Sequence, residues 1–308
     1  MYDLKYIYGP IPSRRLGRSL GISPIPKKTC NYGCVYCMLG TTNHMTNTRE
    51  MFFPVQDLLD EFDIVLHDQI DFDVVSIVGD GEPTLYLGLG ELIRGLRKRT
   101  FKPIAVITNG ALLYDPDVRN ELSLADIVLP TLDAYDEASF KKIYRPHKDL
   151  TFTKIMTGLQ EFSKQFHGQL WLEILLMSGI NDDEASIDAY EKQIATIRHD
   201  KIYLNTTLRP PTVASVKPVD HFRMLEIANR LNAIAIDLHS NNRYLSDITD
   251  DYQALKSIIR RHPMNQHEIT DFLRSRKNPD VTAILRRLSD DPAIDVVAYK
   301  GYHTYRMK

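Results

Sequence analysis

The three cysteines of this 308-residue chain lie within eight residues, at Cys30, Cys34 and Cys37. Three thiolates at such close spacing indicate a metal or iron–sulfur site. A structural zinc site or an ordinary ferredoxin cluster has four protein ligands. Three cysteines therefore leave one iron of a 4Fe–4S cube open to a small molecule, which favours a catalytic cluster. Two alternatives are a zinc loop completed by His44 and a fortuitous group of cysteines.

The gaps of three and then two residues, with Tyr36 directly before the last cysteine, resemble the signature of the radical S-adenosylmethionine superfamily. The resemblance implies two cofactors, one 4Fe–4S cluster and S-adenosylmethionine, whose amino and carboxylate groups chelate the open iron. It also implies a reaction. An electron passed through the cluster breaks the sulfonium C–S bond, and the resulting 5′-deoxyadenosyl radical takes a hydrogen atom from the substrate. We expect Tyr36 to cover the cluster near the adenine.

The composition is that of a soluble globular protein, with a net charge of −2 and 43% hydrophobic residues. No apolar run approaches the ~20 residues that a membrane-spanning helix needs. The first five residues lack the apolar core of a secretory signal. We therefore expect a cytoplasmic protein that does not contact membranes, because a reducing compartment keeps cysteines as thiols.

Short β-rich runs alternate with helical patterns, which is typical of parallel strands joined by helices. The expected strands are 20–25, 74–78, 104–108, 127–132, 170–176 and 201–204. The expected helices are 55–68, 89–98, 137–143, 152–166 and 187–197. Six such units predict an α/β fold with a partial (β/α)6 TIM-like barrel over residues 1–245, as in the resembled family. In parallel barrels the chemistry lies on the loops after the strands, and the cysteine loop follows the first expected strand.

Further motifs follow the next three expected strands. Gly81 and Glu82 resemble the Gly-Gly-Glu motif of the superfamily, which implies that Glu82 holds the methionyl ammonium by a charge-assisted contact. Thr108 and Asn109, and then Asp133, resemble strand ends that contact the methionine carboxylate and the ribose hydroxyls. The alternatives are a surface turn for the glycine motif and helix caps for the other three residues.

Other segments resemble a narrower group, the wyosine-synthase-like radical proteins, whose named members modify a guanosine-derived base in transfer RNA. The segments are 8–17, 144–147, 204–206 and 208–211. Arginines at the barrel mouth would suit an anionic substrate through forked contacts. The candidate substrate residues are Arg14, Arg15, Arg145 and Arg209, and Asn205 is a candidate cofactor residue. The alternative is that each arginine forms an ion pair between loops.

Two further predictions concern the barrel. The segment 177–182 resembles the loop of the family near the adenine, although it could be an ordinary turn. Glu173 and Tyr203, on the fifth and sixth expected strands, could face the interior and touch substrate, because alternate residues of a strand share a face. The wyosine enzymes carry additional cysteines for a second cluster, which this chain lacks. Their pyruvate-dependent reaction is therefore not expected here.

Residues 246–308 are predicted to form a separate, winged-helix-like domain. Helical patterns at 252–261, 268–273 and 281–288 precede two strands at 294–299 and 302–307. From residue 251 onward there are eleven Lys and Arg against seven Asp and Glu. The basic groups that could contact phosphates are Arg286, Arg287, Lys300 and Arg306. Winged helices also bind proteins, so we expect the module to present a substrate, RNA or peptide.

Three functions compete on this sequence. The first is an enzyme that cleaves S-adenosylmethionine, takes electrons from a donor such as flavodoxin or ferredoxin, and abstracts hydrogen from a larger substrate such as RNA. The second is an iron–sulfur sensor that acts on nucleic acid through the C-terminal module, and the third is a zinc-stabilised binding protein. A sensor does not need a barrel, or Glu82 and Asp133 at strand ends, and this favours the enzyme.

Overall fold

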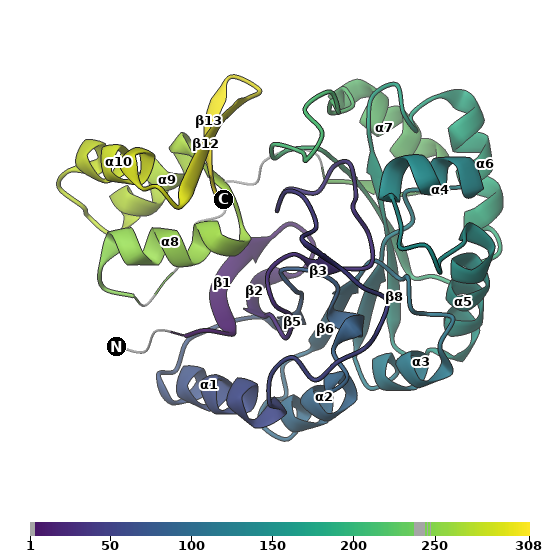
Figure 1. The fold of residues 1–308 in the computed structure, drawn as a ribbon, viewed down its shortest axis with the longest axis horizontal. Coiled ribbons are helices and arrows are strands. Elements are labelled where there is room, and N and C mark those ends of the chain that lie inside the picture. Colours follow the sequence, from purple (N-terminus) through teal and green to yellow (C-terminus); the bar gives the residue numbers. More distant parts are fainter. Residues whose placement is uncertain (1–3, 237–243, 245, 247) are drawn as a thin grey trace.

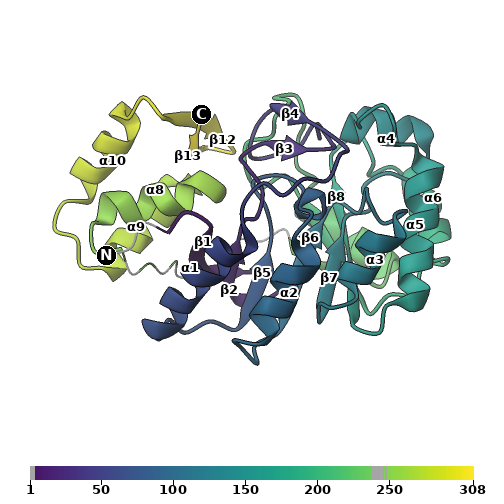
Figure 2. The same cartoon turned by 60° about the horizontal axis from the view of Figure 1, so that its bottom comes forward.

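The computed structural model of the protein describes residues 4–236, 244, 246 and 248–308. Within these residues the central sheet has eight strands in the order β1-β2-β5-β6-β7-β8-β9-β10. β1 and β2 are antiparallel, and the other neighbouring pairs are parallel. The sheet curves, and helices cover its outer side (Figures 1 and 2). Because β1 and β10 end the order, the α/β fold is a partial, TIM-like barrel and not a closed one.

The six expected parallel strands are all present, and β6 has the predicted bounds. The strands are β1 (Ile7–Ser13), β2 (Gly17–Ile22), β5 (Val74–Ile77), β6 (Ile104–Thr108), β7 (Ile127–Pro130), β8 (Gln169–Leu176), β9 (Lys201–Thr206) and β10 (Ile234–Ala235). The helices around them are α1 (Val55–His67), α2 (Leu89–Arg97), α3 (Pro116–Leu122), α4 (Glu137–Tyr144), α5 (Phe152–Gln165), α6 (Glu184–Ile194) and α7 (His221–Arg230). β5 and β7 are buried at every position, as parallel strands covered on both faces are.

Two predicted elements are displaced for identifiable reasons. β2 ends at Ile22, three residues before the predicted end, because Pro24 has no N–H to give to a neighbouring strand. α6 begins three residues before the predicted start. The Asp183 carboxylate accepts a hydrogen bond of 2.9 Å from the N–H of Ser186, and this cap starts the helix at Glu184.

The unpredicted elements of the barrel domain include β1, α3 and α7. β1 contains Gly9, Pro10 and Pro12, which read as a turn, but an edge strand tolerates proline because one side of it needs no ladder. α3 is only seven residues long, and Asp115 caps it in front of Pro116. α7 follows a long irregular segment that gave no clear period.

The C-terminal module contains α8 (Asp251–Arg261), β11 (Met264–Asn265), α9 (Gln266–Ser275), α10 (Val281–Asp290), β12 (Ile294–Tyr299) and β13 (Tyr302–Met307). Its three strands pair in the order β11-β13-β12. α8, α9 and α10 enclose an apolar cluster that includes Leu255, Ile269, Phe272 and Leu288. The predicted helices and hairpin are therefore present. The winged-helix assignment stays a prediction, and so does a domain boundary at residue 245, which lies outside the described residues.

A group of polar side chains joins the module to the barrel. Arg209, on the segment after β9, forms two hydrogen bonds of 2.5 and 2.6 Å with the carboxylate of Glu268 on α9. Arg209 also donates to the hydroxyl of Tyr244 and lies 3.1 Å from Nε2 of His262. The O–H of Tyr299 donates to the carbonyl of Thr207 at 2.7 Å. The module therefore packs against the barrel mouth, to the left in Figure 1.

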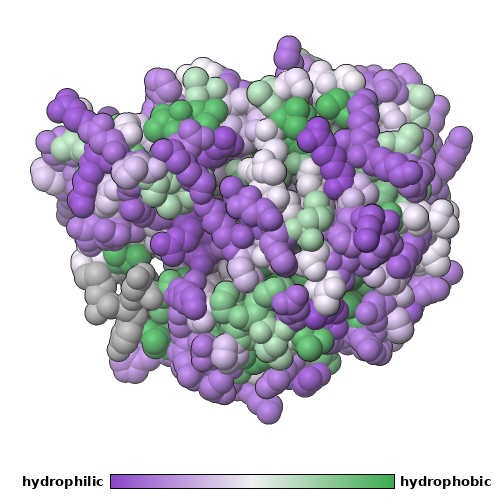
Figure 3. Space-filling view, viewed as in Figure 1, coloured by the Kyte–Doolittle hydropathy of each residue, from purple (hydrophilic) through white to green (hydrophobic). Residues whose placement is uncertain are grey.

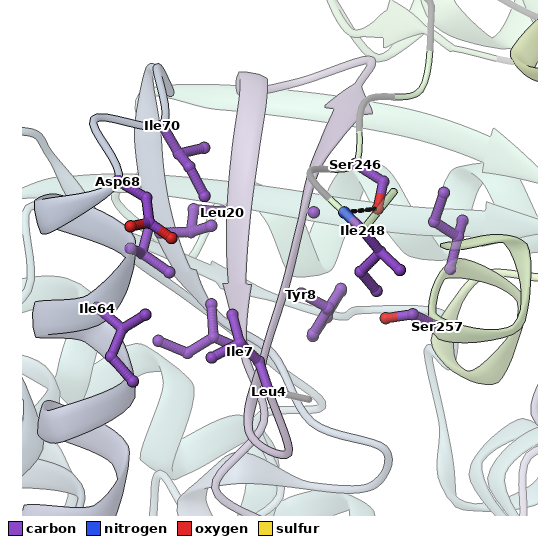
Figure 4. Close-up of a pocket in the computed structure, with 13 residues that line it drawn as sticks. Leu4, Ile7, Tyr8, Leu20, Ile64, Asp68, Ile70, Ser246, Ile248 and Ser257 are labelled. Atoms are coloured by element: carbon purple, nitrogen blue, oxygen red, sulfur yellow. Dashed lines mark hydrogen bonds between the residues drawn. The ribbon is translucent and has the colours of Figure 1, made fainter. Parts of the chain in front are cut away.

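A smaller cavity of about 190 Å³ lies where α8 meets α1 and β1. Ile7, Leu20 and Ile64 line one side of it and Ile248 the other, with Tyr8 between them (Figure 4). The outer surface on the side seen in Figure 1 is mostly hydrophilic, with hydrophobic residues in separate small patches (Figure 3). Among the helices of the described residues, none combines the length and the apolar character that crossing a membrane requires.

Acidification should destabilise the protein through His262. Burial, followed by the positive charge of Arg209, lowers the pKa of His262 to about 3, whereas an unfolded histidine titrates near 6.5. Between these values the unfolded chain binds more protons, so stability falls as the pH drops below about 6.5. At pH 5.5 the expected loss is about 1.4 kcal/mol, because the unfolded histidine sets the limit.

The measurement is the midpoint of thermal unfolding at pH 7.5 and at pH 5.5. The difference between the two midpoints should be smaller in His262→Gln than in the unchanged protein. His167→Gln, at an exposed histidine, is the matched control and should keep the full difference. Equal differences in all three proteins would contradict the role of His262.

Candidate active site

The cysteine loop lies at the C-terminal end of β2, as expected. It runs between two short strands, β3 (Thr29–Cys30) and β4 (His44–Met45), which pair in parallel and lie over the ends of the barrel strands (Figure 2). The N–H of Gly33 donates to the carbonyl of Tyr144 at 2.8 Å, and that of Val35 to Ile143 at 3.0 Å. The last turn of α4 therefore holds the loop in place.

The three thiols are free and partly buried. Burial, followed by the negative charge of Glu82, raises the pKa of Cys30 to about 12. Burial also raises the pKa of Cys34 and of Cys37, and the two other thiols add to the shift at Cys34. Thiols that are close together in such surroundings become thiolates only beside strong positive charge, which metal ions supply. The donor set therefore fits an iron–sulfur cluster.

A single zinc ion has less support. Of the residues that the structure describes, no three or more His, Cys, Asp or Glu are grouped closely enough to hold one ion. His44, the fourth ligand in the zinc alternative, is exposed on β4. An iron–sulfur cube holds its cysteines farther apart than one ion does, because iron and sulfide lie between them.

Glu82 connects the ends of two neighbouring strands. Its carboxylate accepts hydrogen bonds from Oγ1 of Thr108 (2.5 Å), the N–H of Asn109 (2.7 Å) and the N–H of Thr84 (3.0 Å). The side chain is 1% exposed. Burial raises the pKa of Glu82, and the hydrogen bond from Thr108 opposes that shift. The strand-end residues predicted after β5 and β6 thus meet at one buried carboxylate.

The same strand ends contact the cysteine loop. A Cβ on Gly81 would lie 1.7 Å from the carbonyl oxygen of Thr29, so only glycine allows this approach. Nδ2 of Asn109 donates to Oδ1 of Asn31 at 2.7 Å and lies 3.6 Å from Sγ of Cys30. The predicted cofactor residues are therefore directly beside the first cysteine.

Asp133 is fully buried after β7. The hydroxyl of Tyr36 donates to one of its carboxylate oxygens, and the N–H of Leu175 donates to the other at 2.6 Å. Burial raises the pKa of Asp133 to about 7, against the hydrogen bond from Tyr36. Nδ2 of Asn181 donates to the carbonyls of Asp133 and Leu175, which fixes the segment after β8 beside it. In this structure Asp133 therefore anchors Tyr36.

A cavity of about 1160 Å³ opens between the strand ends and the C-terminal module. Tyr36, Cys37 and Met38 line it from the cysteine loop. His267, Asp271 and Arg274 line it from α9, at the spacing of one helix face. This volume is slightly above the roughly 300–1,000 Å³ of ordinary small-molecule pockets, so the cavity is large enough for a cofactor-sized ligand.

Charged side chains line the barrel side of this cavity. Arg15, in the turn between β1 and β2, forms an ion pair with Glu173 on β8. Nδ2 of Asn205 on β9 donates to Glu173 at 2.9 Å, and Arg14 lies 3.4 Å from Oδ1 of Asn205. Arg14 also donates to the carbonyl of Ile236. Four of the predicted residues thus come together, and Nε of Arg15 is buried without a hydrogen-bond partner.

Other predicted residues lie elsewhere or are already engaged. Arg145 is exposed, does not line the cavity and ends α4 in the left-handed conformation with φ of 44°. Arg209 lines the cavity, but its guanidinium is bound to Glu268. Tyr203 is 5% exposed and packs on Trp171 with ring centroids 5.7 Å apart.

The four basic residues that the sequence analysis singled out in the module are outside this cavity. The guanidinium of Arg287 lies 3.7 Å from the ring centroid of Tyr252, and Arg306 pairs with Asp295 at 3.0 Å. Arg286 and Lys300 are exposed, and neither lines the cavity. α9 faces the cavity, whereas α10, which carries Arg286 and Arg287, does not line it.

Sequence reasoning missed Arg49 and the polar face of α9. Nε of Arg49 donates to the carbonyl of Thr84 at 2.9 Å, and its guanidinium also pairs with Glu121. Arg49 therefore fixes the 3-10 turn η1 (Pro83–Leu85) that follows Glu82. No motif points to this arginine, whereas the helical spacing of His267, Asp271 and Arg274 was visible in the sequence.

Comparison with known proteins gives concordant matches. The family model of the Radical SAM superfamily matches residues 25–190. A UPF0026 protein of Methanocaldococcus jannaschii is 34% identical over 283 residues, covering 86% of this chain and 85% of that protein. A protein of Brachyspira hyodysenteriae named GTPase Obg is 38% identical over 220 residues, covering 71% of this chain. The chain spans only 32% of the length of that second relative.

The fold is also found among solved structures. The structure of TYW1 with a lysine–pyruvate adduct bound has a TM-score of 0.54 at 22% identity, covering 73% of this chain and 76% of that one. The superfamily model covers more than half of the chain and includes the three cysteines. Members of this superfamily bind a 4Fe–4S cluster and S-adenosylmethionine. The chain belongs to the radical SAM superfamily and, within it, is related along most of its length to the UPF0026 proteins.

Proposed function

We propose that this protein is a radical S-adenosylmethionine enzyme in which Cys30, Cys34 and Cys37 hold a 4Fe–4S cluster. The observation that carries the proposal is the set of three free thiols directly beside the buried Glu82 network. When bound, the cluster and S-adenosylmethionine supply a 5′-deoxyadenosyl radical that abstracts a hydrogen atom from the substrate. A donor such as flavodoxin or ferredoxin provides the electron.

Glu82 is the proposed partner of the methionyl ammonium. Its carboxylate is buried, and burial raises its pKa, so the ionised form lacks full compensation without a cation nearby. The hydroxyl of Thr108 and the N–H of Asn109 orient the two carboxylate oxygens of Glu82. Both donors are neutral, so the negative charge of the carboxylate is not cancelled. An ammonium group at this position would stabilise the carboxylate, which makes the network suitable for binding the amino acid end of the cofactor.

Tyr36 is the proposed wall for the adenine. It lines the cavity directly before Cys37 and donates to Asp133, whose other carboxylate oxygen accepts from the N–H of Leu175. Asp133 is fully buried, so in this proposal it positions Tyr36 and does not itself bind the ribose. Asn205 reaches the same cavity from β9 and remains a candidate for the ribose or the substrate.

The substrate is proposed to bind between Arg15, Glu173 and α9. The Arg15–Glu173 pair and Asn205 supply a donor and acceptor group on the barrel side. His267, Asp271 and Arg274 supply polar side chains from the module. RNA is the first substrate to test, because the arginines and histidine can pair with phosphate. Nucleic acid and small molecules that copurify with the anoxic protein, identified by mass spectrometry, would reveal the class.

Replacing Cys34 by alanine should abolish cofactor cleavage. Two remaining thiolates cannot hold the cube, so iron content and visible absorbance should fall, and 5′-deoxyadenosine should drop to background. The assay is anoxic reconstitution with iron and sulfide, then dithionite and S-adenosylmethionine, with product measured by chromatography. Thr41→Ala, at an exposed residue near the loop, is the control and should keep full activity. A cluster that forms in the unchanged protein without cleaving S-adenosylmethionine would favour the sensor instead.

Replacing Glu82 by glutamine should weaken binding of S-adenosylmethionine. The change keeps the size of the side chain and removes the negative charge that the ammonium would contact. Hydrogen bonds to charged groups contribute about 1.5–3 kcal/mol, so the dissociation constant should rise about 10- to 100-fold. The measurement is anoxic equilibrium dialysis on protein with matched iron content. Glu161→Gln, in a half-exposed ion pair with Arg119, is the control, and equal affinity in both variants would exclude the assigned role.

A further inference from the structure

The last residue of α8 connects the C-terminal module to the segment that carries Glu82. The guanidinium of Arg261 lies 3.4 Å from the carboxylate of Asp80, and both side chains are less than a tenth exposed. Nη2 of Arg261 donates to the carbonyl of Lys5 at 2.6 Å, and the guanidinium lies 4.7 Å from the ring centroid of Tyr8. Arg261 and Tyr8 both line the large cavity, and Tyr8 also lies on the smaller one in Figure 4.

Asp80 is held in place by its backbone as well. Its N–H donates to Oγ of Ser23 at 3.1 Å, and its carbonyl accepts from the N–H of Lys28 at 2.6 Å. Oδ1 of Asp80 and two nitrogens of Arg261 are buried without a hydrogen-bond partner. The cations that face Asp80 are Arg261, Lys27 and Arg260, in decreasing order of effect. Arg261 is therefore the cation that most stabilises the negative charge of the buried Asp80 carboxylate.

The next two residues lead directly to the cofactor site. Gly81 packs against the carbonyl of Thr29, and the N–H of Glu82 donates to that same carbonyl at 3.1 Å. Thr29 precedes Cys30. Because these backbone contacts join the segment 80–82 to Thr29, a movement of Asp80 displaces both Glu82 and Cys30.

We propose that Arg261 is a positioning residue for S-adenosylmethionine, through which the docked C-terminal module fixes the Asp80–Glu82 segment against the cysteine loop. The inference rests on the proposed function and adds a partner for its cofactor site from outside the barrel. Removing one member of a buried ion pair leaves the other charge uncompensated, so the segment shifts or admits water. Docking of the module and affinity for the cofactor are then coupled, each favouring the other.

The test compares Arg261→Met, Arg261→Lys and Asp80→Asn in the full chain. Hydrogen exchange is measured first, without cluster or cofactor, in peptides that cover 79–86 and 28–34. Arg261→Met and Asp80→Asn should speed exchange in both peptides. After reconstitution, the KM for S-adenosylmethionine should rise roughly tenfold in both variants, with a smaller change in kcat. Arg261→Lys keeps the charge and should restore part of both losses.

The double variant Arg261→Met with Asp80→Asn removes both charges and should be milder than Arg261→Met alone, because the two residues act as one pair. Lys256→Met is the matched control, since it removes an ion pair on the same helix, with Asp291 at 2.7 Å, that lies within the module and does not touch the segment. If Arg261→Met and Asp80→Asn both keep the hydrogen exchange and the KM of the unchanged protein, the inference is overturned and the proposed function stays intact. If the unchanged protein forms no 5′-deoxyadenosine, the proposed function fails, and the exchange data alone decide whether Arg261 holds the segment.

Discussion

The buried carboxylate of Glu82 is the constraint on which the arrangement of the site depends. Its hydrogen bonds fix the end of β6 through Thr108 and Asn109, and its own turn through Thr84. Asn109 in turn reaches Asn31 in the cysteine loop. A charge buried this deeply is stable only when donors surround it, so the strand ends cannot move independently. The ends of the barrel strands thus form a pre-organised site beside the cysteine loop.

Much of the fold could be predicted because parallel strands covered on both sides are almost purely apolar. β6 and the hairpin β12–β13 had their observed bounds in the sequence. β1 could not be found, because Pro10 and Pro12 are compatible with a strand only at a sheet edge, and its edge position is a property of the tertiary fold. The start of α6 could have been predicted from Asp183. Its side chain caps the helix, which therefore begins before the position that the apolar periodicity indicated.

The same difference between local sequence pattern and tertiary packing applies to the candidate site. The cysteine spacing and the strand-end rule predict that Glu82, Thr108 and Asn109 lie at neighbouring strand ends of the cofactor site. The burial of individual side chains and the partners that they contact could not be predicted from the sequence. Asp133 turned out to lie behind Tyr36, Arg209 to be bound by Glu268, and Arg145 to serve through its backbone at a helix end. Side chains of one type look alike in a sequence, and only packing decides which of them reach a cavity. Arg261 and Arg49 carried no motif for that reason.

The turn between β1 and β2 gives the open barrel an unusual property. In the described part of the chain its two outer strands share no backbone ladder. Arg14 spans the gap by donating to the carbonyl of Ile236, directly after β10, and Arg15 pairs with Glu173 on β8. Among the described residues, no hydrogen bond between strands crosses this gap, whereas a ladder of such bonds joins every other neighbouring pair of strands. The contacts that close this side of the large cavity are therefore made by side chains, and Glu173 takes part in them while it also lines the cavity.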